Sequence, residues 1–176
     1  MSVIINGSAG VTTNSGAVYN GLQTDTAKTA TTANVDFTGI PSWVKRITVL
    51  MNDVSLTGTA TLMVRLGTAS GIEASAIYFS MGAALTTATP SVASAFNYTT
   101  GFGLASSAAG NLFAGQIIIT NLTGNTWVMT GTGSGNTSSV LYFMGRVNLT
   151  GALTQLRCTN NGSDTFDSGT INIIYE

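Results

Sequence analysis

The sequence predicts an all-β protein: an antiparallel β-sandwich, jelly-roll-like and oligomeric, with about eight to ten strands. Short runs of Val, Ile, Leu, Tyr and Phe alternate with Gly, Thr, Ser and Asn, a mixture typical of strands joined by turns. Turn signals recur without an apolar stripe at helical spacing, and the best helical segment, residues 91–95, is short. This pattern favours two packed sheets over a parallel α/β arrangement.

Low charge is the second observation behind this prediction. Only 7 % of the residues are charged, against about a quarter in an average domain. The formal net charge is −1, which removes the repulsion that keeps small proteins apart in solution. We therefore expect part of the surface to be buried between copies of the chain.

The composition divides the chain at residue 34. Residues 1–34 are mostly Gly, Ser, Thr, Asn and Ala, so this segment buries too little apolar surface to fold alone. We expect a polar N-terminal attachment strap, either disordered or laid along a partner, in which Val3, Ile4 and Ile5 make the apolar contact. Residues 35–176 are long enough for one hydrophobic core and are expected to form the sandwich.

Ten segments of the sandwich region have the β-branched content and the length of strands. Pro41 prevents a ladder from continuing through residues 39–42, and residues 121–125 separate two apolar runs as a hairpin connection does. From Arg46 the residues begin to alternate, with Arg46, Thr48 and Leu50 on one face and Ile47, Val49 and Met51 on the other, so one face of that strand is expected in the core. Residues 117–119, all isoleucine, show no contrast, and we expect a second subunit or another element to cover their outer side. The expected strands are 35–37, 44–54, 59–66, 76–81, 96–99, 112–121, 126–130, 140–147, 154–158 and 170–175.

The composition leaves little catalytic chemistry. The chain has no histidine, one cysteine and seven carboxylates, whereas acid–base catalysis requires titratable groups tuned to the reaction. We therefore expect a protein that is not an enzyme and has no cofactor, with Cys158 as a structural thiol. A pair of carboxylates is sufficient for a glycosidase, so a depolymerase remains an alternative. Its candidate residues are Asp53, Glu73, Asp164 and Asp167.

Residues 160–169 surround Asp164 and Asp167 with Asn and Ser oxygens, which calcium can use. The spacing is not that of an EF-hand, and Asn, Asp, Ser and Gly are also ordinary turn residues. We expect a structured turn in preference to a calcium site at Asp164 and Asp167.

Two glycine-rich segments, residues 101–104 and 131–135, resemble phosphate-binding loops only superficially. Neither precedes a helix or a Lys-Ser/Thr pair, so both are interpreted as flexible loop tips. The small polar segment 130–139 lies beside Trp127, and loops on a rigid sandwich often carry binding sites. Trp127 and Asn136 are therefore candidate glycan contacts, although we expect Trp127 to fill the core.

The charge and hydropathy patterns also restrict the partners. The six basic residues are scattered except for Lys45 and Arg46, so no nucleic-acid partner is expected. No run approaches the ~20 apolar residues that cross a bilayer, and the N-terminus lacks the pattern of a signal peptide. We expect synthesis in a cytoplasm and no membrane insertion.

Two stretches resemble a known family. They read VDFTGIPSWVKRITV at residues 35–49 and NGSDTFDSGTINIIYE at residues 161–176. Together they resemble the start and end of a C-terminal domain that recurs in structural proteins of tailed-bacteriophage virions, including tail fibres. Between them, Trp-Val-Met at 127–129 and Leu-Thr-Gln-Leu-Arg at 153–157 agree in general features.

The resemblance implies a non-enzymatic virion protein with a β-sandwich that forms oligomers, for which trimers are usual in fibres. It transfers no catalytic residues, and the roughly 34 residues before the domain leave no length for a shaft. The resulting hypothesis is a bacteriophage virion structural protein of the tail-fibre or receptor-binding type, made in the bacterial host. Its expected partners are copies of itself, other virion proteins and host-surface glycans. The alternatives are a capsid-decoration or head-fibre protein, a free carbohydrate-binding module and the two-carboxylate depolymerase.

Overall fold

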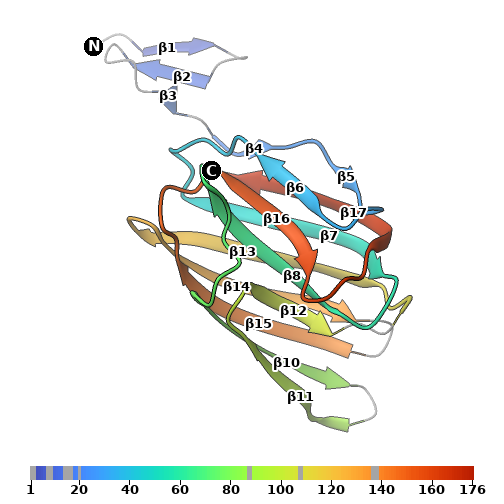
Figure 1. Cartoon of the computed structure of the whole chain (residues 1–176). Coiled ribbons are helices and arrows are strands. Elements are labelled where there is room, and N and C mark those ends of the chain that lie inside the picture. Colours follow the sequence, from blue (N-terminus) through green and yellow to red (C-terminus); the bar gives the residue numbers. More distant parts are fainter. Residues whose placement is uncertain are drawn as a thin grey trace.

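The structure is a computed structural model that describes residues 3–6, 10–13, 18–19, 21–86, 89–106, 109–135 and 139–176. Every regular element in these ranges is a β-strand. Within them, no helix has the length and hydrophobicity needed to cross a membrane. Two antiparallel sheets pack against each other, which confirms the prediction of an all-β sandwich (Figure 1).

The larger sheet contains nine strands in the order β11-β10-β15-β14-β13-β7-β17-β4, with β5 also paired to β17. The strands are β4 Gln23–Thr24, β5 Lys28–Thr29, β7 Arg46–Leu56, β10 Tyr78–Thr86, β11 Thr89–Tyr98, β13 Phe113–Thr123, β14 Thr126–Gly135, β15 Ser139–Asn148 and β17 Phe166–Tyr175. All of their pairings are antiparallel.

The smaller sheet contains five strands in the order β12-β8-β16-β6, with β9 also paired to β8. The strands are β6 Val35–Thr38, β8 Thr61–Thr68, β9 Gly71–Ile72, β12 Phe102–Ser106 and β16 Gln155–Asn160. A separate three-stranded sheet is formed near the N-terminus by β1 Val3–Asn6, β2 Gly10–Thr13 and β3 Val18–Tyr19.

The hydrophobic core lies between the two large sheets and follows the period-two alternation of strand side chains. In β7, Ile47, Val49 and Met51 are buried, while the alternate residues are more exposed, as the sequence predicts. Each of the ten predicted segments overlaps a strand. The connection at residues 121–125 is the predicted hairpin, with Gly124 at φ +50°.

Part of the N-terminal segment also contributes to the sandwich. Strands β4 and β5 pair with β17, and Ala30 is fully buried in the core. Ala30 N–H donates to the carbonyl of Gly169 at 2.9 Å. Residues 21–34 therefore run along the last strand of the domain.

Residues 91–95, the segment with the best helical pattern, lie in β11, in agreement with the all-β prediction. Two sequence interpretations are wrong. Residues 101–104 mostly form β12, and residues 131–135 belong to β14, so neither segment is a loop tip. A Cβ at Gly131 would overlap the ring of Phe143, and one at Gly103 would overlap the ring of Tyr98. These glycines make room for aromatic rings inside strands. In the sequence, glycines with this role look like the glycines of a loop.

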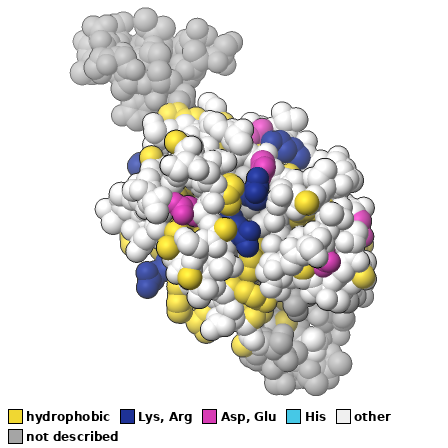
Figure 2. Space-filling view, in the orientation of Figure 1, with side chains coloured by type: hydrophobic (Ala, Val, Ile, Leu, Met, Phe, Trp, Pro, Cys, Tyr) yellow, Lys and Arg dark blue, Asp and Glu magenta, His cyan; other side chains and the backbone are white. Residues whose placement is uncertain are grey.

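The surface is poor in charge. Figure 2 views the side formed by the five-stranded sheet, and most of the visible described surface is neither charged nor hydrophobic. This agrees with the low charge of the chain and makes the few exposed apolar and charged groups informative.

Candidate functional site

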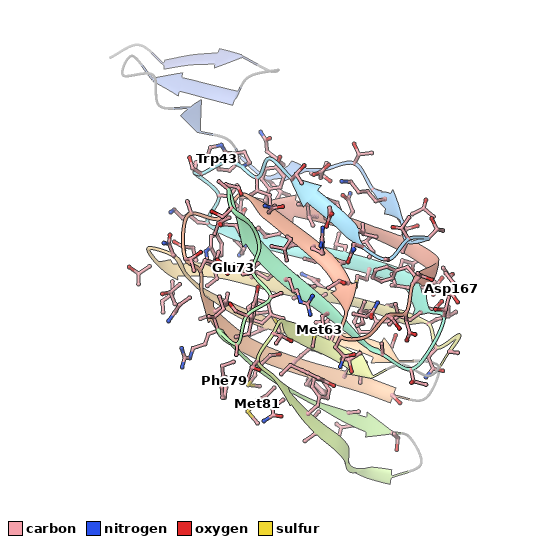
Figure 3. All side chains as sticks on the ribbon, viewed as in Figure 1. Trp43, Met63, Glu73, Phe79, Met81 and Asp167 are labelled. Atoms are coloured by element: carbon pink, nitrogen blue, oxygen red, sulfur yellow. The ribbon has the colours of Figure 1, made fainter. Side chains whose placement is uncertain are left out.

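The outer side of the nine-stranded sheet carries a group of exposed apolar side chains. In β10, Tyr78 and Ser80 point into the sandwich and are buried, so Phe79 and Met81 between them point outward. In β15, Leu141 and Phe143 are buried, and the alternate residues are exposed. Figure 3 labels Phe79 and Met81 on β10, at the opposite side of the molecule from Asp167.

Strand register brings these outward residues together. Strands β10 and β15 are neighbours, and Met81 lies directly opposite Met144. Strands β15, β14 and β13 follow in the sheet, so that Ile118 of β13 lies on the same side. Five of these large side chains are 44 to 57 % exposed, and Ile118 is half-buried. We call this group the apolar face, which consists of Phe79, Met81, Ile118, Val140, Tyr142 and Met144.

The apolar face contains a shallow hollow of about 390 Å³. Its sides are Ile118 of β13 and the pair Tyr142 and Met144 of β15, and between them lie Thr130 and Thr132 of β14. Threonine is shorter than the residues on either side, which explains the depression. The hollow is therefore mostly apolar, with hydroxyl groups between its sides.

Charged groups lie near the limits of this side of the sheet. Arg146 lies opposite Phe79, and its guanidinium carbon is 5.9 Å from the centroid of the Phe79 ring. Arg46 is paired with the carboxylate of Glu176. The six residues of the apolar face carry no charged group, and the guanidinium of Arg146 lies at its edge, against Phe79. The face is therefore suited to burial against another apolar surface.

The apolar face is similar in size to the largest apolar patch of a typical soluble protein. Its five exposed side chains present on the order of 500 Å², taking ~200 Å² for each complete side chain. A patch of this size is about the largest found on a typical monomer and often has a function. The signal in the sequence was the run 140–144, in which five consecutive apolar residues leave no polar side for solvent.

The expectation for the isoleucine strand is refined by the same geometry. Ile117 and Ile119 are fully buried in the sandwich, whereas Ile118 lies on the apolar face and is partly exposed. Within the part of the chain that the structure describes, no strand covers its outer side. Cover by a second subunit stays a prediction.

Trp127 lies in the core with 4 % of its surface exposed, which is the packing role that the sequence favours. Its indole Nε1 is buried and has no hydrogen-bond partner among the described residues. Trp127 also borders a small hollow of about 170 Å³ beside Lys45 and Asn121. A glycan contact by Trp127 stays a prediction, and Asn136 lies outside the described residues. Val3, Ile4 and Ile5 form part of β1, and their role in attachment also stays a prediction.

The four candidate carboxylates have four different sets of hydrogen-bond partners. Asp164 accepts from the backbone N–H of Ala60 at 2.8 Å, and Asp167 accepts from the hydroxyl of Ser55. Glu73 accepts from the hydroxyl of Thr150, and Asp53 accepts from the amide of Asn52 at 3.3 Å. Among the residues that the structure describes, no three His, Cys, Asp or Glu side chains are grouped to hold a metal ion.

These hydrogen bonds describe what Asp164 and Asp167 do in the fold. Asp164 closes the connection from β16 to β17 against the residues just before β8, and Asp167 ties β17 to β7. Both are cross-links between distant segments of the chain. The two-carboxylate depolymerase and the calcium site remain hypotheses without further support from this geometry.

Cys158 is completely buried in β16. Burial raises the pKa of its thiol, because the thiolate is poorly solvated in the core, and the nearby carboxylate of Asp36 acts in the same direction. A buried neutral thiol is a poor nucleophile.

Comparisons with protein-family models, with curated proteins and with solved structures found no match to this chain.

Proposed function

We propose that this chain is a non-enzymatic structural protein that assembles with copies of itself through the apolar face, as a bacteriophage virion protein of the tail-fibre or receptor-binding type. The observation that carries the proposal is the group of exposed side chains on β10 and β15. Met81 lies opposite Met144, with Phe79 next to Met81 on the outer side of β10 and Tyr142 next to Met144 on the outer side of β15. Exposing these apolar side chains to water costs about 25 cal/mol of free energy per Å² of apolar surface. Assembly removes that cost.

A second copy of the chain is the partner that this surface fits best. A face without charge is complementary to itself, and a twofold axis through it would place the same residues on both sides. A standard interface buries about 800 Å² per partner, with an apolar centre and a polar rim. The apolar face supplies such a centre, and Gln116, Thr130 and Thr132 supply amide and hydroxyl groups beside it. A trimer, the state usual for fibres, would instead divide this face between two neighbours, because the interfaces around a threefold axis join two different patches.

The virion assignment is supported by the two stretches that resemble phage domains. Residues 35–49 contain β6 and the start of β7, and residues 161–176 contain β17. Strands β7 and β17 are neighbours in the sheet, with Ile47 opposite Tyr175. The two stretches, which are distant in sequence, therefore form one continuous part of the fold.

We further propose that the sandwich belongs to the jelly-roll type. Consecutive strands repeatedly change sheet: β6 and β8 lie in the smaller sheet, and β7 between them lies in the larger one. The same change occurs at β12 and again at β16. Such alternation is typical of Greek-key sandwiches.

Size-exclusion chromatography with light scattering on the full chain tests the assembly. We expect an oligomer at micromolar concentration, and dissociation in a variant that carries both Met81→Ser and Met144→Ser. Leu122→Ser is the matched control, because Leu122 is 66 % exposed in the β13–β14 hairpin, outside the apolar face. A monodisperse monomer at high concentration, or equal effects of the two variants, contradicts the proposal.

Immunogold labelling of intact particles tests the virion assignment. Label at the tail supports the receptor-binding type, and label over the capsid supports the decoration or head-fibre alternative. Particles without label contradict both.

A further inference from the structure

The outer side of the five-stranded sheet carries a row of charged residues on three neighbouring strands. Arg157 of β16 lies directly opposite Asp36 of β6 on one side and Arg65 of β8 on the other. Their neighbours Phe37, Leu156 and Leu66 point into the core, so the three charged side chains share the outer side. Figure 2 shows basic side chains grouped with acidic ones on this side of the molecule.

One carboxylate in this row is already occupied. Asp36 accepts two hydrogen bonds from Arg157, at 2.6 Å from Nε and 2.8 Å from Nη2. Lys28 donates from Nζ to the backbone carbonyl of Asp36 and lies 4.5 Å from the centroid of the Phe37 ring. Lys28 therefore contacts the backbone of β6 and not the carboxylate. The row of Arg65, Arg157 and Asp36 holds two cations and one carboxylate, which leaves it positive on a chain whose net charge is −1.

Arg65 is the cation that the row does not neutralise. Its Nε donates to the carbonyl of Thr100 at 2.8 Å, and its side chain lies against Gly101. Within the described ranges, no carboxylate is within ion-pair distance of Arg65. The Nη2 atom is 4.0 Å from the sulfur of Met63, so the outer edge of the guanidinium has only a weak contact there.

The position of Arg65 is electrostatically unfavourable in the unliganded protein. Like charges directly opposite each other on neighbouring strands destabilise a sheet. Partial burial lowers the pKa of Arg65; Tyr78 opposes this effect and the positive charge of Arg157 adds to it, although arginine stays protonated. A bound anion would offset both costs. The bond to Thr100 also holds the side chain in one place, which reduces the entropy lost on binding.

We propose that this row, with Arg65 as its main contact, binds the carboxylate or phosphate of an acidic saccharide. The guanidinium fork matches the geometry of both oxyanions and forms charge-assisted hydrogen bonds with them. The inference deepens the proposed function by naming a class of glycan, and it rests on that function only for the choice of a glycan as the ligand.

An aromatic ring on the same side fits a saccharide. The ring of Tyr98 covers Gly103 of β12, which lies opposite Met63 of β8. The Tyr98 hydroxyl is 2.7 Å from Oγ1 of Thr61, so the ring is held in place. Sugar rings have apolar faces that pack on such side chains. Nucleic acid would require a larger basic field than two arginines and one carboxylate provide.

Isothermal titration calorimetry with three polysaccharides tests this site. Polygalacturonate carries carboxylates, phosphomannan carries phosphates and dextran is uncharged. We expect binding to at least one acidic polymer and none to dextran, and the stronger of the two identifies the oxyanion. Arg65→Gln is expected to weaken this binding by about tenfold or more, the scale of one charge-assisted pair. Arg146→Gln is the matched control, because it removes the same charge from an exposed arginine on the other sheet.

Three outcomes overturn the site: no binding to either acidic polymer, equal losses in the two arginine variants, or tighter binding of a single-stranded oligonucleotide that Arg65→Gln abolishes. Light scattering on Arg65→Gln separates this site from the assembly proposal. The variant should keep the oligomeric state of the parent, because Arg65 lies on the sheet opposite the apolar face. If the parent protein is a monomer and still binds the acidic polymer, the binding-site proposal is retained and the assembly proposal is rejected.

Discussion

The hydroxyl of Tyr78 in β10 accepts a hydrogen bond from the backbone N–H of Leu66 in β8, with 2.8 Å between the two atoms. Strand β12 pairs with β8 as far as Val64, and β9 pairs with it from Gly67 onward. The N–H of Leu66 therefore lies in the gap between these two strands. The Tyr78 hydroxyl satisfies it from the opposite sheet, and it is 3.2 Å from the carbonyl of Glu73. This contact joins the two layers of the sandwich.

Tyr78→Phe should lower the free energy of unfolding. The substitution leaves the buried N–H of Leu66 without this acceptor, at a cost of about 1–3 kcal/mol. Urea denaturation followed by tryptophan fluorescence measures the change. Tyr142→Phe is the control, because Tyr142 is exposed on the apolar face, and it should change stability by less than about 0.5 kcal/mol. Equal midpoints for the two variants would show that the Tyr78 contact is unimportant.

Stability should fall at alkaline pH. Burial raises the pKa of the Cys158 thiol above its ordinary value of 9.0 and that of the Tyr78 hydroxyl above 10.0. Each group keeps its proton in the folded state and releases it on unfolding once the pH exceeds the ordinary value. The free energy of unfolding is thus unaffected by these groups below about pH 9 and falls above it, by up to ~1.4 kcal/mol per pH unit for each group.

Single substitutions show which group causes the fall in the free energy of unfolding at alkaline pH. Cys158→Ala should reduce the loss that begins near pH 9, and Tyr78→Phe should reduce the loss above about pH 10. Urea denaturation at a series of pH values measures both. Slopes identical to that of the parent protein would show that neither group is responsible.

Gly131→Ala should destabilise the sandwich. A Cβ at this position would overlap the ring of Phe143 and lie 2.7 Å from the carbonyl oxygen of Gln116. Neither neighbour can move freely, since one is buried and the other belongs to the β13 backbone, so a cost of about 1–3 kcal/mol is expected. Gly21→Ala is the control, because a Cβ there meets nothing within 4 Å. Equal melting temperatures for the two variants in thermal denaturation would contradict this explanation.

Asp164→Ala should lower the melting temperature because it removes the acceptor for the N–H of Ala60. The loss of a partly buried charge-assisted hydrogen bond costs about 1–2 kcal/mol. The melting temperature of the parent protein should be the same with and without a chelator. A decrease caused by the chelator, and reversed by added calcium, would instead support a calcium site at Asp164 and Asp167.

Local patterns predicted most of the strands. The alternation that starts at residue 46 and the apolar residues within the predicted strands 112–121 and 140–147 depend only on neighbouring residues, which is why these strands were found. The glycines of β12 and β14 were misinterpreted because the aromatic rings that require glycine at these positions lie on other strands. Gly103 accommodates Tyr98, and Gly131 accommodates Phe143.

The sequence by itself determined the all-β class, the positions of the main strands and the shortage of charge, since strand periodicity and composition are local properties. Only the tertiary structure decided that Met81 faces Met144 and that Arg65 faces Arg157. Both pairs join segments far apart in the chain. Their register follows from hydrogen bonding across whole sheets and from burial of one side of every strand, so neither the apolar face nor the row of charged residues could be located from any single segment.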